Sequence, residues 1–178
     1  MKLDISSELH KQIDRILNLK NFDTISFYYN FKRLVYNLEK FHNSIGKKAS
    51  NTKELSAIQF DVQKSKLPKA GQVAYFYIEH SYPKELFNSH WCLVVKDLGS
   101  ILLVIPLTSI KDDSNPVDKE REMIVKIKDF AEDGCSKLKI NQMFSADLMR
   151  LDQSRPIYEL QTSFDYIKNN IKKLLDLC

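Results

Sequence analysis

In the first third of the chain, hydrophobic residues recur every three or four positions, which is the period of an amphipathic helix. The pattern runs through residues 5–17, repeats over 22–45 and stops at Gly46, a residue type that often ends helices. Ser6 or Ser7 is placed to cap the first helix. These positions predict two helices that form a hairpin.

A third, shorter helix is expected within residues 51–63. The helix pair carries one hydrophobic face that needs a cover. Packing of this face on the rest of the same chain is the default expectation, with a second copy or an inhibitor segment as alternatives.

Beyond residue 70 the pattern changes to short hydrophobic runs separated by turn residues, which is typical of β-strands. Five segments have this character: residues 72–78, 91–95, 101–105, 122–127 and 138–143. Residues 158–177 return to helical spacing, with one hydrophobic face. The pattern therefore predicts a mainly β fold with α elements, a small barrel or rolled sheet that ends in a helix.

The stretch of residues 67–71 contains Pro68 and Gly71 and interrupts any helix. We therefore divide the chain into a helical N-terminal extension, residues 1–66, and a barrel domain, residues 67–178.

Composition changes this interpretation little. The 178 residues are 43% hydrophobic, enough for a core, and the formal net charge of +4 favours an anionic partner only weakly. The three cysteines, Cys92, Cys135 and Cys178, lack metal-ligand spacing, and their odd number argues against a disulfide framework. No segment approaches the length of a membrane span. We expect a cytoplasmic protein without a metal or other cofactor.

Four segments, in order along the chain, carry a recognisable set of motifs. Residues 71–76 open a strand with Gly-Gln-Val, and Glu85 precedes His90-Trp91 by five positions ahead of a hydrophobic run. Residues 105–109 read Ile-Pro-Leu-Thr-Ser, and residues 141–151 contain Gln142 at the start of a polar segment. Together these segments resemble the MazF/PemK family of toxins, over residues 71–178.

The resemblance implies a small SH3-like barrel of the CcdB/MazF type with a C-terminal helix. It implies an endoribonuclease, a hydrolase of toxin–antitoxin systems that cleaves single-stranded RNA without a metal, through attack of the 2′-hydroxyl to give a cyclic phosphate. It also implies a homodimer whose partners are RNA and an antitoxin, more readily a protein than an RNA.

Carried over position by position, the resemblance assigns the catalytic positions to His90, Thr108, Ser109 and Glu85. The family has an arginine where this chain has His90. Histidine exchanges the permanent charge of arginine for a group that accepts and donates protons near neutral pH. A structural role is the alternative for each of these residues, with Thr108 and Ser109 bonding local backbone and Glu85 facing solvent.

The residues expected to contact RNA are Trp91, Lys139, Asn141, Gln142 and Ser89. Trp91 is suited to stack on a base, although a lone tryptophan is more often part of a core or an interface. Lys139 on an alternating strand is equally compatible with a solvent-facing position.

His80 and Tyr82, in the loop before Glu85, are further candidates for RNA contact. Two other functions stay open. One is a phage-defence ribonuclease of the AbiQ/ToxN type, and the other is a barrel that binds RNA or protein without cutting.

Overall fold

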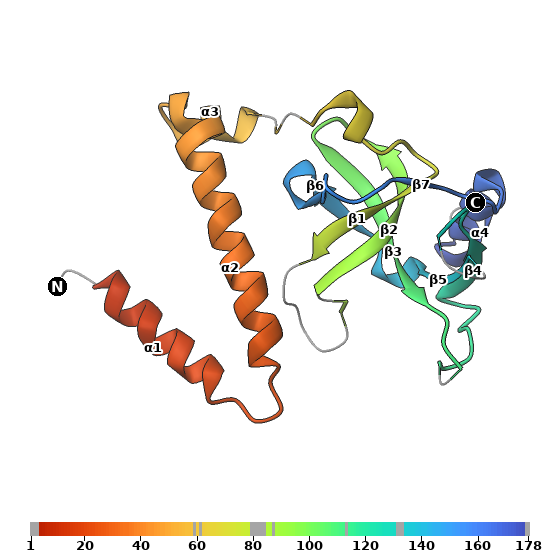
Figure 1. Ribbon diagram of the computed structural model, residues 1–178, viewed down its shortest axis with the longest axis horizontal. Helices are drawn as coiled ribbons and strands as arrows, with labels where there is room; N and C mark the ends of the chain where they lie inside the picture. Colours follow the sequence, from red (N-terminus) through yellow and green to blue (C-terminus); the bar gives the residue numbers. More distant parts are fainter. Residues whose placement is uncertain are drawn as a thin grey trace.

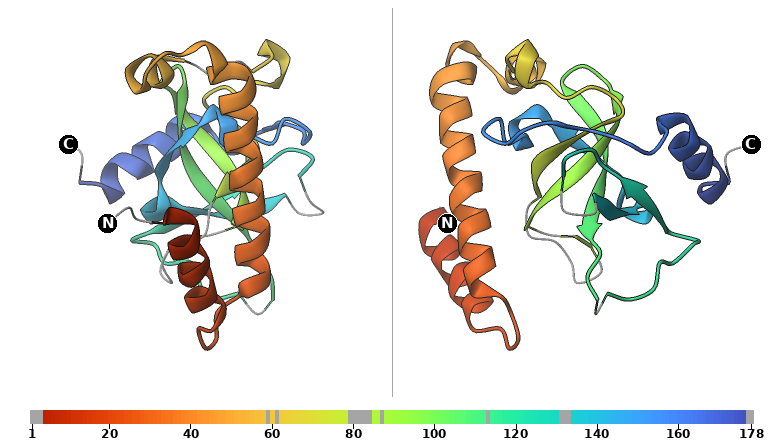
Figure 2. Two further views of the ribbon diagram at one scale, coloured as in Figure 1. Left: turned by 90° about the vertical axis from the view of Figure 1, so that its left-hand side faces the viewer. Right: turned by 45° about the vertical axis from the view of Figure 1, so that its right-hand side comes forward.

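The computed structural model describes residues 4–58, 60, 62–78, 85–86, 88–112, 114–130 and 134–176. The chain forms a curled, antiparallel sheet with helices on two sides (Figure 1). The N-terminal helices lie on one side of the sheet and the C-terminal helix on the other (Figure 2). The expected combination of a rolled sheet with a C-terminal helix is confirmed, and the strands are antiparallel.

The first two helices occupy the positions that the hydrophobic period predicts. Helix α1 spans Ile5–Leu17 and α2 spans Thr24–Lys40, and α2 continues into a π-helical turn, Phe41–Ile45. A 3-10 turn at Gly46–Lys48 precedes α3, Thr52–Ala57, which is shorter than expected. The backbone therefore leaves α-geometry before Gly46, at Phe41.

The cap of α1 differs from expectation. The carboxylate of Asp4 accepts a hydrogen bond from the backbone N–H of Ser7 at 3.3 Å, so Ser6 and Ser7 lie inside the helix. Asp23 caps α2 in the same way, through the backbone N–H of Ser26 at 2.9 Å. A carboxylate at the N-cap accepts a hydrogen bond from a backbone N–H that has no partner within the helix. Its negative charge also interacts favourably with the positive end of the helix dipole.

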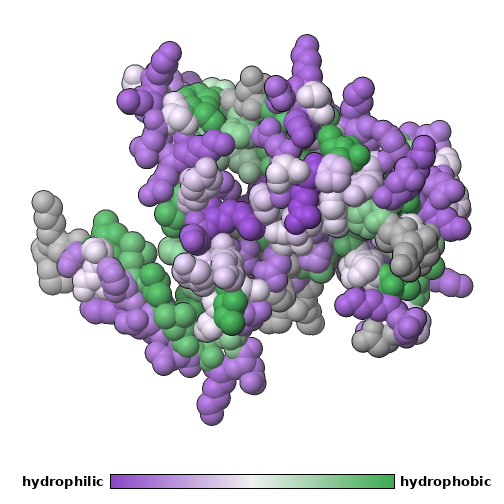
Figure 3. All heavy atoms as spheres, viewed as in Figure 1, coloured by the Kyte–Doolittle hydropathy of each residue, from purple (hydrophilic) through white to green (hydrophobic). Residues whose placement is uncertain are grey.

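The described residues leave much of the hydrophobic face of the helix pair exposed, so the expected intramolecular cover is only partial among them. No residue of α1 is buried, and Asn30 is the buried residue of α2. Exposed hydrophobic side chains follow both helices, and Figure 3 shows them along α1. They include Ile5, Leu9, Leu17, Ile25, Tyr28 and Tyr36.

Within the described residues, seven strands build the sheet. They are β1 (Gln72–Ile78), β2 (Asn88–Asp97), β3 (Ile101–Ser109), β4 (Glu122–Lys126), β5 (Cys135–Lys139), β6 (Phe144–Asp147) and β7 (Tyr158–Glu159). Their order is β4-β5-β3-β2-β1-β7, and β6 also pairs with β3. Strand β2 extends beyond the predicted run at both ends and β3 at its C-terminal end, because pairing with neighbours continues past the hydrophobic residues.

Strand β3 changes partners along its length, which curls the sheet. Its first part pairs with β2 on one side and β6 on the other, and its last residues, Leu107 to Ser109, pair with β5. The pairing of β2 with β3 ends where Cys92 meets Pro106. Since proline has no N–H to donate, this is a natural place for the two strands to part.

Two hydrophobic clusters form the core, one on each face of the central strands. The first contains Phe76, Cys92 and Val104, and the second contains Leu93 and Ile105. Helix α4, Phe164–Leu174, completes the second cluster with Ile167 and Ile171. The alternation of side chains along a strand explains why neighbouring residues enter different clusters.

Two predicted boundaries near the C-terminus are wrong. The segment 138–143 is not one strand, because β5 ends at Lys139 and Ile140–Gln142 forms a 3-10 turn. The final helix begins at Phe164, after the Ser163 cap, because Tyr158–Glu159 pairs with β1 instead. Among the described residues, no helix is long and apolar enough to cross a membrane.

Candidate functional site

A cavity of about 330 Å³ opens where β2 and β3 separate, and we call it the His90 pocket. The start of β2 forms one side, the end of β3 forms another, and an adjacent residue of β5 contributes. The lining residues are Tyr75, Ser89, His90, Trp91, Leu107, Thr108, Ser109, Phe130 and Ser136. Three of the four predicted catalytic residues, His90, Thr108 and Ser109, thus line one site.

The sheet holds these residues in place from both sides. His90 is paired with Phe76 of β1, whose side chain is fully buried in the core. Thr108 is paired with Lys137 of β5, and Ser109 with Ser136. Backbone pairing therefore fixes both walls of the pocket, which suits a site that has to hold a substrate in one geometry.

The hydroxyl of Thr108 has an unusual environment. Its Oγ1 atom is buried and makes no hydrogen bond with any residue that the structure describes. A buried polar atom without a partner costs about 1–3 kcal/mol relative to a satisfied one. Such a group is uncommon in folded proteins, and Thr108 is one of the residues that line the cavity.

Further hydroxyls and an aromatic wall surround the same cavity. Ser89, Ser109 and Ser136 contribute hydroxyl groups. Trp91 makes edge contacts with three aromatic rings, those of Tyr75, Phe130 and Tyr158, at centroid distances of 5.0, 5.2 and 5.1 Å. Trp91 thus belongs to an aromatic cluster and lines the pocket as well.

An arginine from the helical extension reaches the edge of this pocket. The Nη1 of Arg33 donates a hydrogen bond to the Oγ of Ser89 at 3.1 Å, and its Cζ lies 3.8 Å from the ring centroid of Tyr77. One turn earlier on α2, the Nδ2 of Asn30 donates to the Oδ1 of Asn88 at 2.7 Å. Nothing in the spacing of the sequence connects residue 33 with residue 89.

Tyr77 sits between this arginine and a carboxylate. Burial, together with a hydrogen bond to Asp152, raises the pKa of Tyr77 to about 12. Burial acts to raise the pKa of Asp152 too, but hydrogen bonds from Ser154 and Tyr77 and the charge of Arg155 outweigh it and lower that pKa. Tyr77 therefore stays a neutral hydrogen-bond donor at physiological pH.

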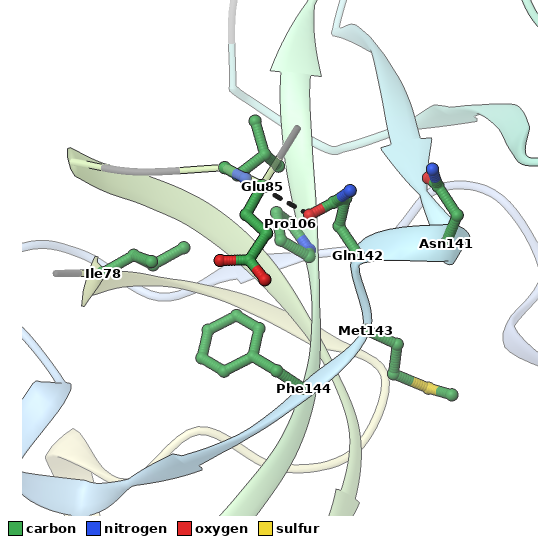
Figure 4. A pocket seen from close by; sticks show the side chains of 8 residues that line it. Ile78, Glu85, Pro106, Asn141, Gln142, Met143 and Phe144 are labelled. Carbon is green, nitrogen blue, oxygen red and sulfur yellow. Dashed lines mark hydrogen bonds between the residues drawn. The ribbon is translucent and has the colours of Figure 1, made fainter. Parts of the chain in front are cut away.

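A second cavity, of about 400 Å³, holds the other predicted residues of the loop and the 3-10 turn, and we call it the Glu85 pocket. Its lining includes Glu85, Asn141 and Gln142, and the backbone N–H of Leu86 donates to the Oε1 of Gln142 at 3.2 Å. Figure 4 shows the Glu85 carboxylate directed into this space and the Asn141 side chain turned away from it. Glu85 is a lining residue of this pocket and not of the His90 pocket.

Lys139 lines neither pocket. Its ammonium group forms an ion pair with Glu122 on the adjacent strand, and both side chains are largely withdrawn from solvent. The spacing of the sequence gave no indication of this pairing, because Glu122 lies on a different strand.

His80 and Tyr82 lie outside the described residues. No group of three or more His, Cys, Asp or Glu within the described part of the chain is arranged to hold a metal ion. Cys92 is buried, and burial raises the pKa of its thiol, which makes it a poor nucleophile.

Neither a scan of protein-family models nor a search of curated proteins gives a match to this chain.

Proposed function

We propose that this protein is a metal-independent endoribonuclease of the MazF/PemK toxin type, with its active site in the His90 pocket. The curled sheet and its C-terminal helix are, in this proposal, a barrel of the SH3-like CcdB/MazF type. The observation that supports it most is the meeting of His90, Thr108 and Ser109 at one cavity, where the buried threonine hydroxyl has no partner among the described residues.

RNA cleavage without a metal requires a proton acceptor, a proton donor and hydrogen-bond donors for the phosphate oxygens. In the proposed reaction, His90 accepts the proton of the 2′-hydroxyl as the 2′-oxygen attacks phosphorus. The bond from phosphorus to the 5′-oxygen breaks, and that oxygen takes a proton from the imidazolium or from water. The products are a 2′,3′-cyclic phosphate and a free 5′-hydroxyl.

In this proposal, the hydroxyl groups of the pocket bind the phosphate of the RNA. Thr108 and Ser109 donate hydrogen bonds to the non-bridging oxygens, whose negative charge increases in the transition state. Because Glu85 lines the other cavity, the proton-accepting role falls on His90.

The resemblance also proposes the partners. It implies a homodimer in which RNA crosses two copies, and an antitoxin that blocks this path. Sedimentation of the purified chain with and without the product of a neighbouring small gene tests this part independently of catalysis.

The catalytic proposal is tested with purified full-length protein and a mixed single-stranded RNA in EDTA. The unmodified protein is expected to give fragments that end in cyclic phosphate. His90→Ala is expected to slow cleavage by about 100-fold or more. His10→Ala, an exposed helix residue, is the matched control and is expected to retain the full rate.

Thr108→Val separates a catalytic role from a structural one. Valine has nearly the same shape as threonine but no hydroxyl, so it removes the unpartnered polar atom. We expect the free energy of unfolding to stay equal or rise by about 1 kcal/mol while the cleavage rate falls by about 100-fold. Thr108→Ser is expected to keep most activity. An unmodified protein that leaves RNA intact, or a Thr108→Val variant at full rate, refutes the proposal.

A further inference from the structure

The residues that line the His90 pocket carry no permanent positive charge within the described chain. None of the residues that line it within the described chain is an arginine or a lysine. A phosphodiester carries one negative charge, and its cleavage adds more at the transition state, so a fixed cation beside the pocket has an obvious use.

Helix α2 brings a guanidinium to this place. Arg33 contacts Ser89, which lines the pocket, at 3.1 Å and lies over the ring of Tyr77 at 3.8 Å. Ser89 and Tyr77 are direct partners across β1 and β2, so Arg33 spans a single cross-strand pair. The buried Asn30 and its contact with Asn88 hold the helix at this position.

The charge of Arg33 is available, whereas Lys139 and Arg155 are already paired with carboxylates. No carboxylate forms an ion pair with Arg33 among the residues that the structure describes, while Lys139 pairs with Glu122 and Arg155 with Asp152. Ser89 uses one of the five N–H donors of the guanidinium. The remaining donors match the fork that arginine presents to a phosphate.

From these contacts we infer that Arg33 of the helical extension binds a backbone phosphate of single-stranded RNA at the mouth of the His90 pocket. The extension is then part of the active site, which is composite, and the sheet alone holds an incomplete one. Tyr77, beneath Arg33, and Tyr75, with the guanidinium of Arg155 at 5.1 Å, lie beside each other on β1 with ring centroids 6.1 Å apart. This inference depends on the proposed ribonuclease function.

The alternative role for Arg33 is mechanical, as a latch that fastens α2 to the sheet. The two roles differ in their dependence on salt. Each arginine–phosphate contact releases counterions, so its loss lowers the steepness with which affinity falls as salt rises. A latch changes stability and leaves that steepness unchanged.

The test measures binding of a fluorescent 2′-O-methyl RNA, which cannot be cleaved, to the full-length protein from about 50 to 200 mM salt. Arg33→Ala is expected to weaken binding about tenfold at the lower salt and to reduce the slope of log affinity against log salt by about one. Arg33→Lys keeps the slope but not the full affinity. Two controls keep the slope of the unmodified protein: Lys32→Ala, the neighbouring cation, and Asn30→Ala, the uncharged anchor.

The possible outcomes are distinct. If Arg33→Ala and Asn30→Ala weaken binding equally and neither alters the slope, Arg33 is a latch and the inference is wrong, even if the unmodified protein cleaves RNA. If the unmodified protein binds RNA without cleaving it, the catalytic proposal fails, and the slope of Arg33→Ala still decides the role of this residue. If it neither binds nor cleaves RNA, both fail.

Discussion

The N-terminal helices and the C-terminal sheet both carry regular hydrophobic patterns, but they use them differently. The sheet buries its pattern on both faces, and side chains such as Phe76, Leu93 and Ile105 are fully excluded from solvent. Helices α1 and α2 leave much of theirs exposed, and α2 contacts the sheet through the polar side chains of Asn30 and Arg33.

The region that stabilises the fold therefore differs from the region that supplies Arg33 to the proposed site. Because burial of apolar area contributes most of the free energy of folding, the sheet accounts for most of the stability. Hydrogen bonds and a cation–π contact fasten α2, and such contacts contribute about 1 kcal/mol each. Four paired substitutions, from the largest expected effect to the smallest, test whether the two regions differ as described.

The largest contrast is expected from the same substitution in each region. Leu93→Ala removes a fully buried side chain and should lower the free energy of unfolding by about 2–5 kcal/mol. Leu9→Ala, on α1, removes a side chain that is 57% exposed and should change the free energy of unfolding by about 0.5 kcal/mol or less. Urea denaturation monitored by the fluorescence of Trp91 measures both. A large loss in Leu9→Ala would mean that the helix face is covered in solution.

Two glycines give the next contrast. Gly134 has φ +64°, and an added Cβ would lie 2.6 Å from the carbonyl oxygen of Ile127, so Gly134→Ala should cost about 2–3 kcal/mol. Gly46 has a right-handed backbone, and an added Cβ meets the flexible end of Leu55. Gly46→Ala should therefore cost about 1 kcal/mol or less. Equal midpoints of thermal unfolding in the two variants would contradict this ranking.

Ion pairs should follow the same division. Glu122 is 10% exposed and bonds to Lys139, and Glu122→Ala should cost about 1–2 kcal/mol because a charge-assisted bond is lost in a half-buried place. Glu8 on α1 is 44% exposed and bonds to Lys11 at 2.7 Å. Glu8→Ala should cost about 0.5 kcal/mol or less, and less again in high salt. The check is urea denaturation at low and high ionic strength, and a salt-insensitive loss in Glu8→Ala would go against it.

The smallest effect concerns the contact between the regions. The pKa of Tyr77 is raised to about 12 in the folded protein. The neutral phenol therefore contributes fully to the free energy of unfolding below pH 10, and this contribution is lost as pH rises from 10 to 12. The loss should be about 1 kcal/mol or less, since the ring is partly screened by solvent. Tyr77→Phe removes this part of the alkaline dependence, and Tyr29→Phe, on the exposed face of α2, should leave it in place. If Tyr77→Phe and the unmodified protein lose the same free energy of unfolding between pH 9 and pH 11, Tyr77 contributes nothing to the alkaline dependence.

Sequence reasoning located the elements where local chemistry decides them. Strand β1 coincides with the predicted residues 72–78 and α1 with residues 5–17, because a hydrophobic period and a nearby cap are local properties. It misplaced β5 and the start of α4. At those points, pairing with distant strands outweighed the period, as when Tyr158–Glu159 joined β1.

The motif spacing also predicted only part of the candidate site correctly. The motif spacing identified His90, Thr108 and Ser109, which line one pocket. It also grouped Glu85, Asn141 and Gln142 with them, whereas these residues line another cavity, and Lys139 is held by Glu122. Arg33, Ser136 and Tyr77 carried no signal, because their relation to the site exists only after distant segments pair.

The sequence by itself determined the hydrophobic period, the caps available to each helix and the hydroxyl and imidazole groups that the end of β3 and the start of β2 would carry. Only the tertiary structure decided that β3 leaves β2 after Pro106, which opens the pocket, and that α2 sets Arg33 against Ser89 at its mouth. Local propensities act over a few residues, while the pairing of strands and the docking of a helix depend on contacts between residues that are 56 positions apart, such as these two.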